Sequence, residues 1–262
     1  MTERLLATDM DRTLLPNGLQ EADPDALDRF RTWAGHRAPC LLAYVTGRHW
    51  SLARGMFGKF DLPEPDWLVC NVGTEIYARG ADRPLEEWRS VLERDFDAEA
   101  IRKSTDGALP GARLQESEKQ SSLKVSYYLD GPPPRDLCEE MQERIGKQGL
   151  AARVVVSYDE TEELGLVDFL APGSGKANAL TFLRRHLGLA RDRVLFSGDS
   201  GNDSDALLSG VCGVLVGNAT EAVRERLRQA LPTHPEARIY FAQRPYTAGI
   251  LEGMAHYGWE GS

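Results

Sequence analysis

The stretch "ATDMDRTLLPN", residues 7–17, decides the fold and marks a candidate site. It closes an apolar run with two carboxylates, Asp9 and Asp11, and then enters a turn. Residues i and i+2 of a strand point to the same side, so the two charges lie side by side where a buried strand ends. A solvated turn tolerates such a pair because Asp favours turns. A metal ion and a phosphate would require it.

Strand-like apolar runs alternate with helical patterns around this stretch. The runs "CLLAYVTG" at 40–47 and "DWLVCNVG" at 66–73 are nearly all apolar, as expected for strands covered on both faces. Asp23 and Pro24 predict a helix start before them, with Gly35 as the C-cap. These βαβ units predict an α/β core built on a parallel sheet with right-handed crossovers.

The pattern changes in the middle of the chain. The run "LKVSYYLD", residues 123–130, alternates apolar and polar side chains, which is typical of a sheet covered on one face only. A helical segment at about 134–149 and two further strand-like runs follow it. We therefore expect a smaller inserted α+β domain at residues 82–168.

The first pattern then resumes. Ser174 is the expected N-cap of a helix, and the buried-strand runs "RVLFSGD" at 193–199 and "GVLVGN" at 213–218 follow it. The α/β core should therefore consist of residues 1–81 and 169–262.

The composition excludes several classes of protein. The chain has 262 residues, and its net charge of -9 disfavours nucleic acids and anionic membranes as partners. The four cysteines are far apart and form no CxxC pair, which argues against a zinc site or a disulfide framework. The segment MTERLLATD is too short and acidic for a signal peptide, and no apolar run reaches about 18 residues. We expect a reduced, cytoplasmic protein with no membrane partner.

Polar residues follow the strands that should end at one edge of the core sheet, where ligands of open parallel sheets bind. Clustered carboxylates raise one another's pKa unless a cation intervenes. The sequence places only oxygen ligands here, with no His or Cys nearby, which favours a hard cation such as Mg²⁺. A hydroxyl and an ammonium group could hold a phosphate against it. The residues concerned are Asp9, Asp11, Thr46, Lys176, Asp199 and Asp203.

These segments together resemble the haloacid dehalogenase (HAD) superfamily of phosphotransferases. Asp9 to Thr13 matches the motif DxDx[TV], and Thr46 matches the Thr/Ser that follows a strand. Lys176 matches the family's Lys, and residues 198–203 match its GDxxxD motif. Each motif alone is weak, but all four occur in order and in context. The resemblance spans the core and implies a HAD-like Rossmannoid fold whose inserted domain is a type 2 cap, a domain that selects the organic part of the substrate.

The resemblance also implies a role for each matching residue. Asp9 would be the nucleophile that forms an aspartyl-phosphate, and Asp11 the general acid and then the base. The phosphate ligands would be Thr46, Gly47, Lys176 and Asn202. The Mg²⁺ ligands would be Asp9, the backbone carbonyl of Asp11, and Asp199, with Asp203 and Asn202 in support.

Among type 2 caps, the segments "AYVTGR", "VGTEIY", "KVSYYLD", "GDSGND" and "AGILEGMAHY" are similar to those of sucrose-phosphate phosphatases. This implies hydrolysis of sucrose 6-phosphate to sucrose and phosphate, in sucrose biosynthesis. The expected sugar contacts are Arg48, Glu75, Lys124 and Ser126. Arg12 departs from the family pattern, since many members have Gly or Asn there.

Two alternatives stay open at this point. The first is a phosphatase of another sugar phosphate, such as a mannosylfructose, trehalose, glycosylglycerate or hexose phosphate. The second is a non-catalytic sugar-binding or regulatory protein on the same scaffold, although such a protein would be expected to have lost one of the motif residues. We expect a monomer that binds a small sugar phosphate, and association with a sugar-phosphate synthase is left open.

Overall fold

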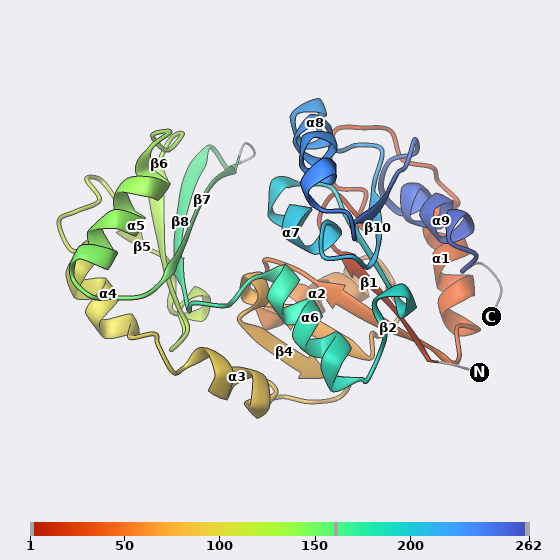
Figure 1. Cartoon of the computed structure of the whole chain (residues 1–262), viewed down its shortest axis with the longest axis horizontal. Helices are drawn as coiled ribbons and strands as arrows, with labels where there is room; N and C mark the ends of the chain where they lie inside the picture. Colours follow the sequence, from red (N-terminus) through yellow and green to blue (C-terminus); the bar gives the residue numbers. More distant parts are fainter. Residues whose placement is uncertain (1–2, 160–161, 260–262) are drawn as a thin grey trace. The chain divides into compact units, whose positions relative to one another are not determined.

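The computed structural model describes residues 3–159 and 162–259 (Figure 1). The chain divides into two compact units. The core unit comprises Met1–Pro84 and Gly175–Ser262, and the inserted unit comprises Leu85–Ser174. Within the described residues, no helix combines the length and the apolar character that crossing a membrane requires.

The core unit is built on a seven-stranded sheet with the order β11-β10-β9-β1-β2-β3-β4. Every neighbouring pair is parallel except β3 and β4, which confirms the predicted α/β class with a mostly parallel sheet. The apolar runs form the strands because both faces are covered, and β1 is buried from its second residue onward. The strands are β1 Arg4–Asp9, β2 Cys40–Val45, β3 Trp67–Cys70, β4 Glu75–Ala78, β9 Val194–Gly198, β10 Cys212–Leu215 and β11 Arg238–Phe241.

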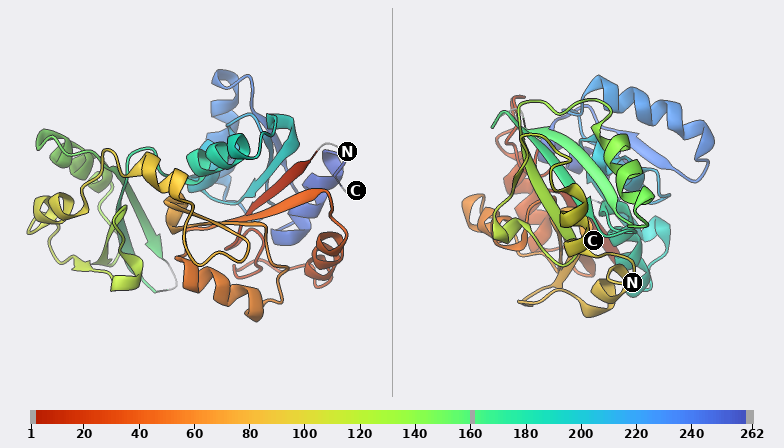
Figure 2. Two further views of the ribbon diagram at one scale, coloured as in Figure 1. Left: turned by 90° about the horizontal axis from the view of Figure 1, so that it is seen from below. Right: turned by 90° about the vertical axis from the view of Figure 1, so that its left-hand side faces the viewer.

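Helices cover both faces of this sheet (Figure 2, left). On one face lie α1 Ala26–Gly35, α2 Trp50–Lys59 and α9 Tyr246–His256, and their apolar side chains join those of the strands in one buried cluster. On the other face α6 Lys176–His186 packs against α7 Ser204–Leu207. The remaining core helix, α8 Glu221–Ala230, is capped by the Thr220 side chain.

Two predicted helix starts are wrong. Helix α1 begins at Ala26 instead of Pro24, because the Ala26 amide bonds to the Asp23 carbonyl three residues back, and the four-residue spacing of an α-helix starts only with the bond from Arg29 to Asp25. The Asp23 carboxylate does accept the Asp25 amide at 3.0 Å, as a capping side chain would. Helix α6 begins at Lys176 with Gly175, not Ser174, at the N-cap. Gly175 has a φ of 119°, a conformation that favours glycine.

The inserted unit contains an antiparallel sheet with the order β5-β6-β8-β7. Its elements are α3 Glu86–Leu92, α4 Ala98–Thr105, β5 Arg113–Leu114, β6 Lys124–Asp130, α5 Leu137–Lys147, β7 Arg153–Asp159 and β8 Leu164–Leu170. One sheet face packs on α4 and α5 through a buried cluster that includes Ile101, Val125 and Phe169. The expected boundary at residue 168 falls inside β8. The observed unit ends at Ser174 because β8 pairs with β6 and β7 along its whole length.

Candidate active site

The sheet topology brings the acidic residues together at its carboxyl edge. Asp9 ends β1, and Asp199 directly follows β9, the strand that pairs in parallel with β1. Thr46 follows β2 on the other side of β1. Lys176 is the first residue of α6. All four side chains are buried, so the site forms within the core unit and is shielded from bulk water.

Lys176 is the central cation of the site. Its Nζ lies 2.8 Å from Oδ1 of Asp9 and 2.9 Å from Oδ1 of Asp203. Burial alone would lower the pKa of Lys176, but the adjacent carboxylates of Asp203 and Asp9 raise it above its ordinary value. The ammonium group therefore stays charged next to the expected nucleophile.

Three buried carboxylates lie close together at this site, and two of them contact the ammonium group. Asp9, Asp199 and Asp203 each offer an oxygen within 4.8 Å of the others. Burial raises the pKa of Asp9 and brings that of Asp199 to about 6, and the neighbouring Asp charges act in the same direction. The excess of negative charge and the all-oxygen donor set fit a divalent hard cation such as Mg²⁺.

Asp203 also holds the loop that carries Asp199. Its Oδ2 accepts hydrogen bonds from the amide of Asp199 at 3.2 Å and from the amide and hydroxyl of Ser200 at 3.1 Å each. Gly198 makes room for it, since a Cβ there would lie 2.5 Å from the Asp203 side chain. Most of the hydrogen-bonding capacity of the Asp203 carboxylate is used by groups of the protein, which suits a supporting role better than direct ligation of a metal ion.

Thr13 joins the two acidic segments and was missed as a functional residue. Its hydroxyl lies 3.1 Å from Oδ1 of Asp199 and 3.4 Å from Oδ2 of Asp9. The sequence does mark this residue, because the Thr at the end of DxDx[TV] is the one hydroxyl in the loop after β1 and could be expected to bond the carboxylates.

Asp11 points into a set of hydrogen-bond donors. Arg48 binds it with two contacts of 2.7 Å, from Nε to Oδ2 and from Nη2 to Oδ1, and Asn17 donates to Oδ1 at 2.8 Å. Burial would raise the pKa of Asp11, but the bonds and charge of Arg48, helped by Asn17, lower it overall. Asp11 is therefore a carboxylate in this arrangement. Arg48, expected at the sugar, here contacts the expected general acid.

Arg12 places a second cation beside the acidic cluster. Its Nε lies 3.6 Å from Oδ2 of Asp199, while about half of the side chain is exposed. The backbone of Arg12 is left-handed, with a φ of 59°, and its carbonyl accepts a 2.6 Å bond from Asn218. The residue that departs from the family pattern thus contributes positive charge to the metal side of the site.

Within the part of the chain that the structure describes, three other predicted residues of the core unit form no hydrogen bond or ion pair with the buried carboxylates or with Lys176, although Asn202 and Gly47 are chain neighbours of Asp203 and Thr46. Glu75 is on β4 and accepts the hydroxyl of Tyr77 at 2.9 Å. Asn202 is exposed and accepts the hydroxyl of Ser200 at 2.9 Å. Gly47 directly follows Thr46 at the end of β2.

Lys124 and Ser126 lie on β6 of the inserted unit, and both are buried, unlike the open strand face that the alternation indicates. They meet Asp168 of β8, which stands opposite Ser126 in the strand register. The Ser126 hydroxyl donates to Oδ1 of Asp168, and Nζ of Lys124 lies 3.6 Å from the same oxygen. A carboxylate within the apolar run "LGLVDFL" was the signal for Asp168.

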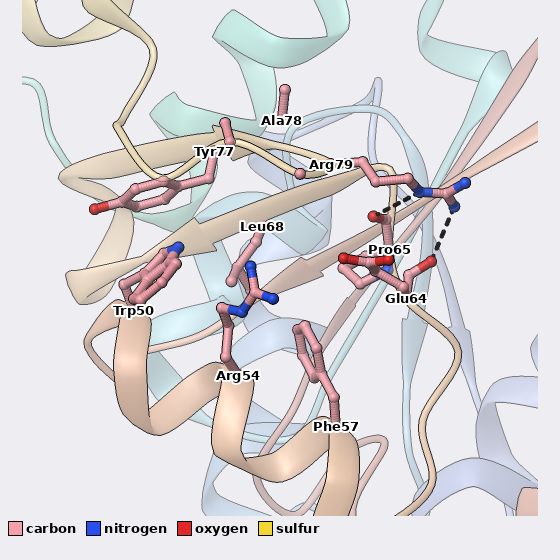
Figure 3. Close-up of a pocket in the computed structure, with 11 residues that line it drawn as sticks. Trp50, Arg54, Phe57, Glu64, Pro65, Leu68, Tyr77, Ala78 and Arg79 are labelled. Atoms are coloured by element: carbon pink, nitrogen blue, oxygen red, sulfur yellow. Dashed lines mark hydrogen bonds between the residues drawn. The ribbon is translucent and has the colours of Figure 1, made fainter.

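A surface groove of the core unit lies between α2 and the β3–β4 hairpin (Figure 3). Arg54 lies over the Trp50 ring at 5.0 Å, and Tyr77 packs against that ring at 6.0 Å. Arg79 is held by the carbonyls of Glu64 and Pro65, as the dashed lines show. Trp50 is therefore a packing residue, and the groove contains none of the acidic cluster.

The comparisons with known proteins agree with this geometry. Residues 2–258 match the family of sucrose-6F-phosphate phosphohydrolases. A HAD-like hydrolase of Nitrosococcus oceani is 38% identical over 97% of this chain and 71% of its own length. Sucrose-phosphatase 1 of Nicotiana tabacum is 27% identical over 97% of this chain, which spans only 59% of that relative's length.

Two relatives match along nearly their whole length. The crystal structure of the sucrose-phosphatase of Synechocystis, in complex with sucrose and phosphate, has a TM-score of 0.80 and 28% identity, over 98% of this chain and 99% of that one. The mannosylfructose-phosphate phosphatase of Agrobacterium fabrum is 29% identical over 97% of both chains. The chain therefore belongs to the sucrose-6F-phosphate phosphohydrolase family, within the HAD superfamily.

Proposed function

We propose that the protein is a Mg²⁺-dependent phosphatase that hydrolyses sucrose 6-phosphate through an aspartyl-phosphate. One observation carries this proposal: the buried Asp9 carboxylate lies 2.8 Å from Lys176 Nζ, beside Asp199 and Asp203. This combination offers a nucleophile, a cation for the phosphoryl group and ligands for a metal. The likeness to a sucrose-phosphatase supports the choice of substrate.

In the proposed first step, an oxygen of Asp9 attacks phosphorus and the bond from phosphorus to the sugar oxygen breaks. Asp11 gives a proton to the leaving sugar oxygen. Asp11 then takes a proton from a water molecule, and that water attacks the aspartyl-phosphate to release phosphate and restore Asp9. Lys176 and Thr46 bind the phosphoryl oxygens throughout. When bound, Mg²⁺ would supply further charge neutralisation for the phosphoryl group.

The pairing of Asp11 with Arg48 bears on the order of proton transfers. A carboxylate held by two 2.7 Å contacts to Arg48 is in the charge state of a base. To act first as an acid, Asp11 must take up a proton and exchange Arg48 for the substrate. Arg48 would then be released to bind the substrate, which reconciles its observed place with its predicted one.

The inserted unit supports a sugar as the organic group. Lys124, Ser126 and Asp168 gather a cation, a hydroxyl and a carboxylate on one sheet face, opposite the apolar face that packs on α4 and α5. Such a set of donors and acceptors suits sugar hydroxyls. We propose that these three residues contact the sugar.

Mannosylfructose phosphate is the second candidate substrate. The relative that carries this name matches 97% of both chains at 29% identity, close to the 28% of the sucrose-phosphatase structure. The chemistry at Asp9 would be the same, and only the sugar contacts would differ.

A phosphate-release assay tests the proposal. Sucrose 6-phosphate, mannosylfructose phosphate, trehalose 6-phosphate and glucose 6-phosphate are compared with Mg²⁺ and with EDTA. Sucrose 6-phosphate should give the highest kcat/KM, and EDTA should abolish release. Asp9→Asn should abolish turnover, while Asp61→Asn, a matched change at an exposed Asp, should have no effect. Near-normal activity of Asp9→Asn would refute the mechanism. A higher kcat/KM with another sugar phosphate would show that this compound, not sucrose 6-phosphate, is the preferred substrate.

A further inference from the structure

A strained turn connects β3 to β4 beside the candidate active site. Asn71, Val72 and Gly73 are consecutive residues with φ values of 49°, 58° and 88°, all in the left-handed region. Only Gly adopts this region without a steric cost, and a β-branched residue such as Val72 rarely does. Such conformations persist where surrounding structure imposes them, and they cluster at functional sites.

One side of the turn holds the segment after β2. The amide of Val72 donates to the carbonyl of Thr46 at 3.3 Å, and the amide of Asn71 donates to the carbonyl of Arg48 at 2.9 Å. The amide of Thr46 in turn donates to the Val69 carbonyl at 2.8 Å. The backbone of the proposed phosphate ligand Thr46 is therefore fixed by this turn.

The other side of the turn touches the start of α6. A Cβ on Gly73 would lie 2.4 Å from the carbonyl carbon of Gly175, 2.5 Å from its oxygen and 2.9 Å from the amide nitrogen of Lys176. The two backbones are thus in direct contact at Gly73. The same turn meets both segments that supply the proposed phosphate ligands.

We infer that the turn Asn71–Gly73 is a positioning element that sets the distance between Thr46 and Lys176, with Gly73 as the positioning residue. This inference rests on the proposed function, in which those two side chains bind the phosphoryl group. The turn itself touches no substrate. It acts by holding the backbone of one ligand against the backbone of the other.

The test compares Gly73→Ala with Gly80→Ala. Both glycines are left-handed, with φ values of 88° and 74°, so both variants carry the same backbone penalty. A Cβ at Gly80 meets no atom within 4 Å, whereas at Gly73 it must move about 1 Å to restore an ordinary contact of 3.4 Å. A displacement of about 1 Å can lower the rate by about 10²-fold.

Gly73→Ala should therefore lower kcat/KM by about 10²-fold and weaken the binding of inorganic phosphate in the presence of Mg²⁺, measured by calorimetry. Gly80→Ala should match the wild type in both. Circular dichroism establishes a temperature at which both variants are folded. A folded Gly73→Ala protein with wild-type phosphate affinity overturns the inference and leaves the proposed function standing. Wild-type protein that releases phosphate from no sugar phosphate overturns the function, while the comparison of phosphate binding still decides the inference.

A second pair of variants decides the matter if Gly73→Ala does not fold. Thr74 closes the turn by donating its hydroxyl to the Asn71 carbonyl at 3.0 Å, and Thr105 makes a similar buried bond to Ile101 at 2.9 Å in the inserted unit. Thr74→Val should weaken phosphate binding about fivefold, the value of one hydrogen bond, and Thr105→Val should not. Equal phosphate affinities of these two variants overturn the inference.

Discussion

Replacing Lys176 with Met would show whether one buried cation holds the acidic cluster together. The two side chains have similar lengths, so the change removes charge and hydrogen bonds more than volume. Asp9 and Asp203 would lose their contacts of 2.8 and 2.9 Å with the ammonium group. Three buried carboxylates would then lie within 4.8 Å of one another without it.

The structure sets the size of the expected effect. With an effective dielectric constant of about 20, each of the two contacts has a Coulomb energy of about 6 kcal/mol. Burial of the ammonium ion offsets several kcal/mol of this. Removing one partner of a buried ion pair costs about 3–5 kcal/mol, because the remaining charge is left uncompensated. We expect the free energy of unfolding to fall by about this amount.

Urea unfolding in EDTA at pH 8, with and without added Mg²⁺, measures the loss. Mg²⁺ should restore part of it, since a divalent cation can replace the missing charge. The loss should be smaller at pH 5, because burial raises the pKa of Asp199 to about 6 and a proton then neutralises this carboxylate in both proteins. Lys103→Met is the control, since Lys103 and Glu99 form an exposed pair at 2.7 Å whose loss should not be measurable. A loss below about 1 kcal/mol at pH 8 in EDTA would refute the reasoning.

Three further predictions concern other charges. The folded-state pKa of Asp199, about 6, is above its ordinary 3.8, so its contribution to stability is full below about pH 4 and is lost as the pH rises through 6. Asp199→Asn should therefore stabilise the metal-free protein by up to about 3 kcal/mol at pH 7 and by less at pH 5, and equal urea midpoint shifts at the two pH values would contradict this. Arg48→Lys removes the two-pronged contact that lowers the pKa of Asp11, so this pKa should rise in the variant. The acid limb of the kcat/KM profile should then move to higher pH, and an unmoved limb would count against the pairing of Arg48 with Asp11. Asp66 accepts bonds from Arg37, Arg79 and the Leu42 amide, and Asp66→Asn should cost about 1.5–3 kcal/mol of unfolding free energy with kcat unchanged, while a kcat change without a stability loss would show a functional role.

The meeting of Asp9 and Asp199 could be predicted from the sequence, because apolar runs mark the strands and parallel strands end at one sheet edge. The pairing of side chains from different segments could not be predicted in this way. Arg48 and Asp11 are 37 positions apart, and no local pattern shows that they face one another.

Two other features needed tertiary information. Asp168 stands opposite Ser126 only through the register of β6 and β8, which the two runs do not encode separately. The start of α6 was misplaced because Ser174 satisfies the N-cap preference locally. The left-handed Gly175 and its contact with Gly73 determine the actual start.

The division of the chain into two units has a consequence for engineering. The residues proposed for phosphoryl transfer all belong to the core unit, whereas Lys124, Ser126 and Asp168 belong to the Leu85–Ser174 segment. Replacing that segment with its counterpart from a relative of another sugar preference would exchange all three proposed sugar contacts at once. The segment ends at Ser174, directly before Gly175, so a chimera should keep Gly175, the N-cap of α6, from this chain. On the proposed function, substrate preference would follow the inserted segment and phosphoryl transfer would stay with the core unit.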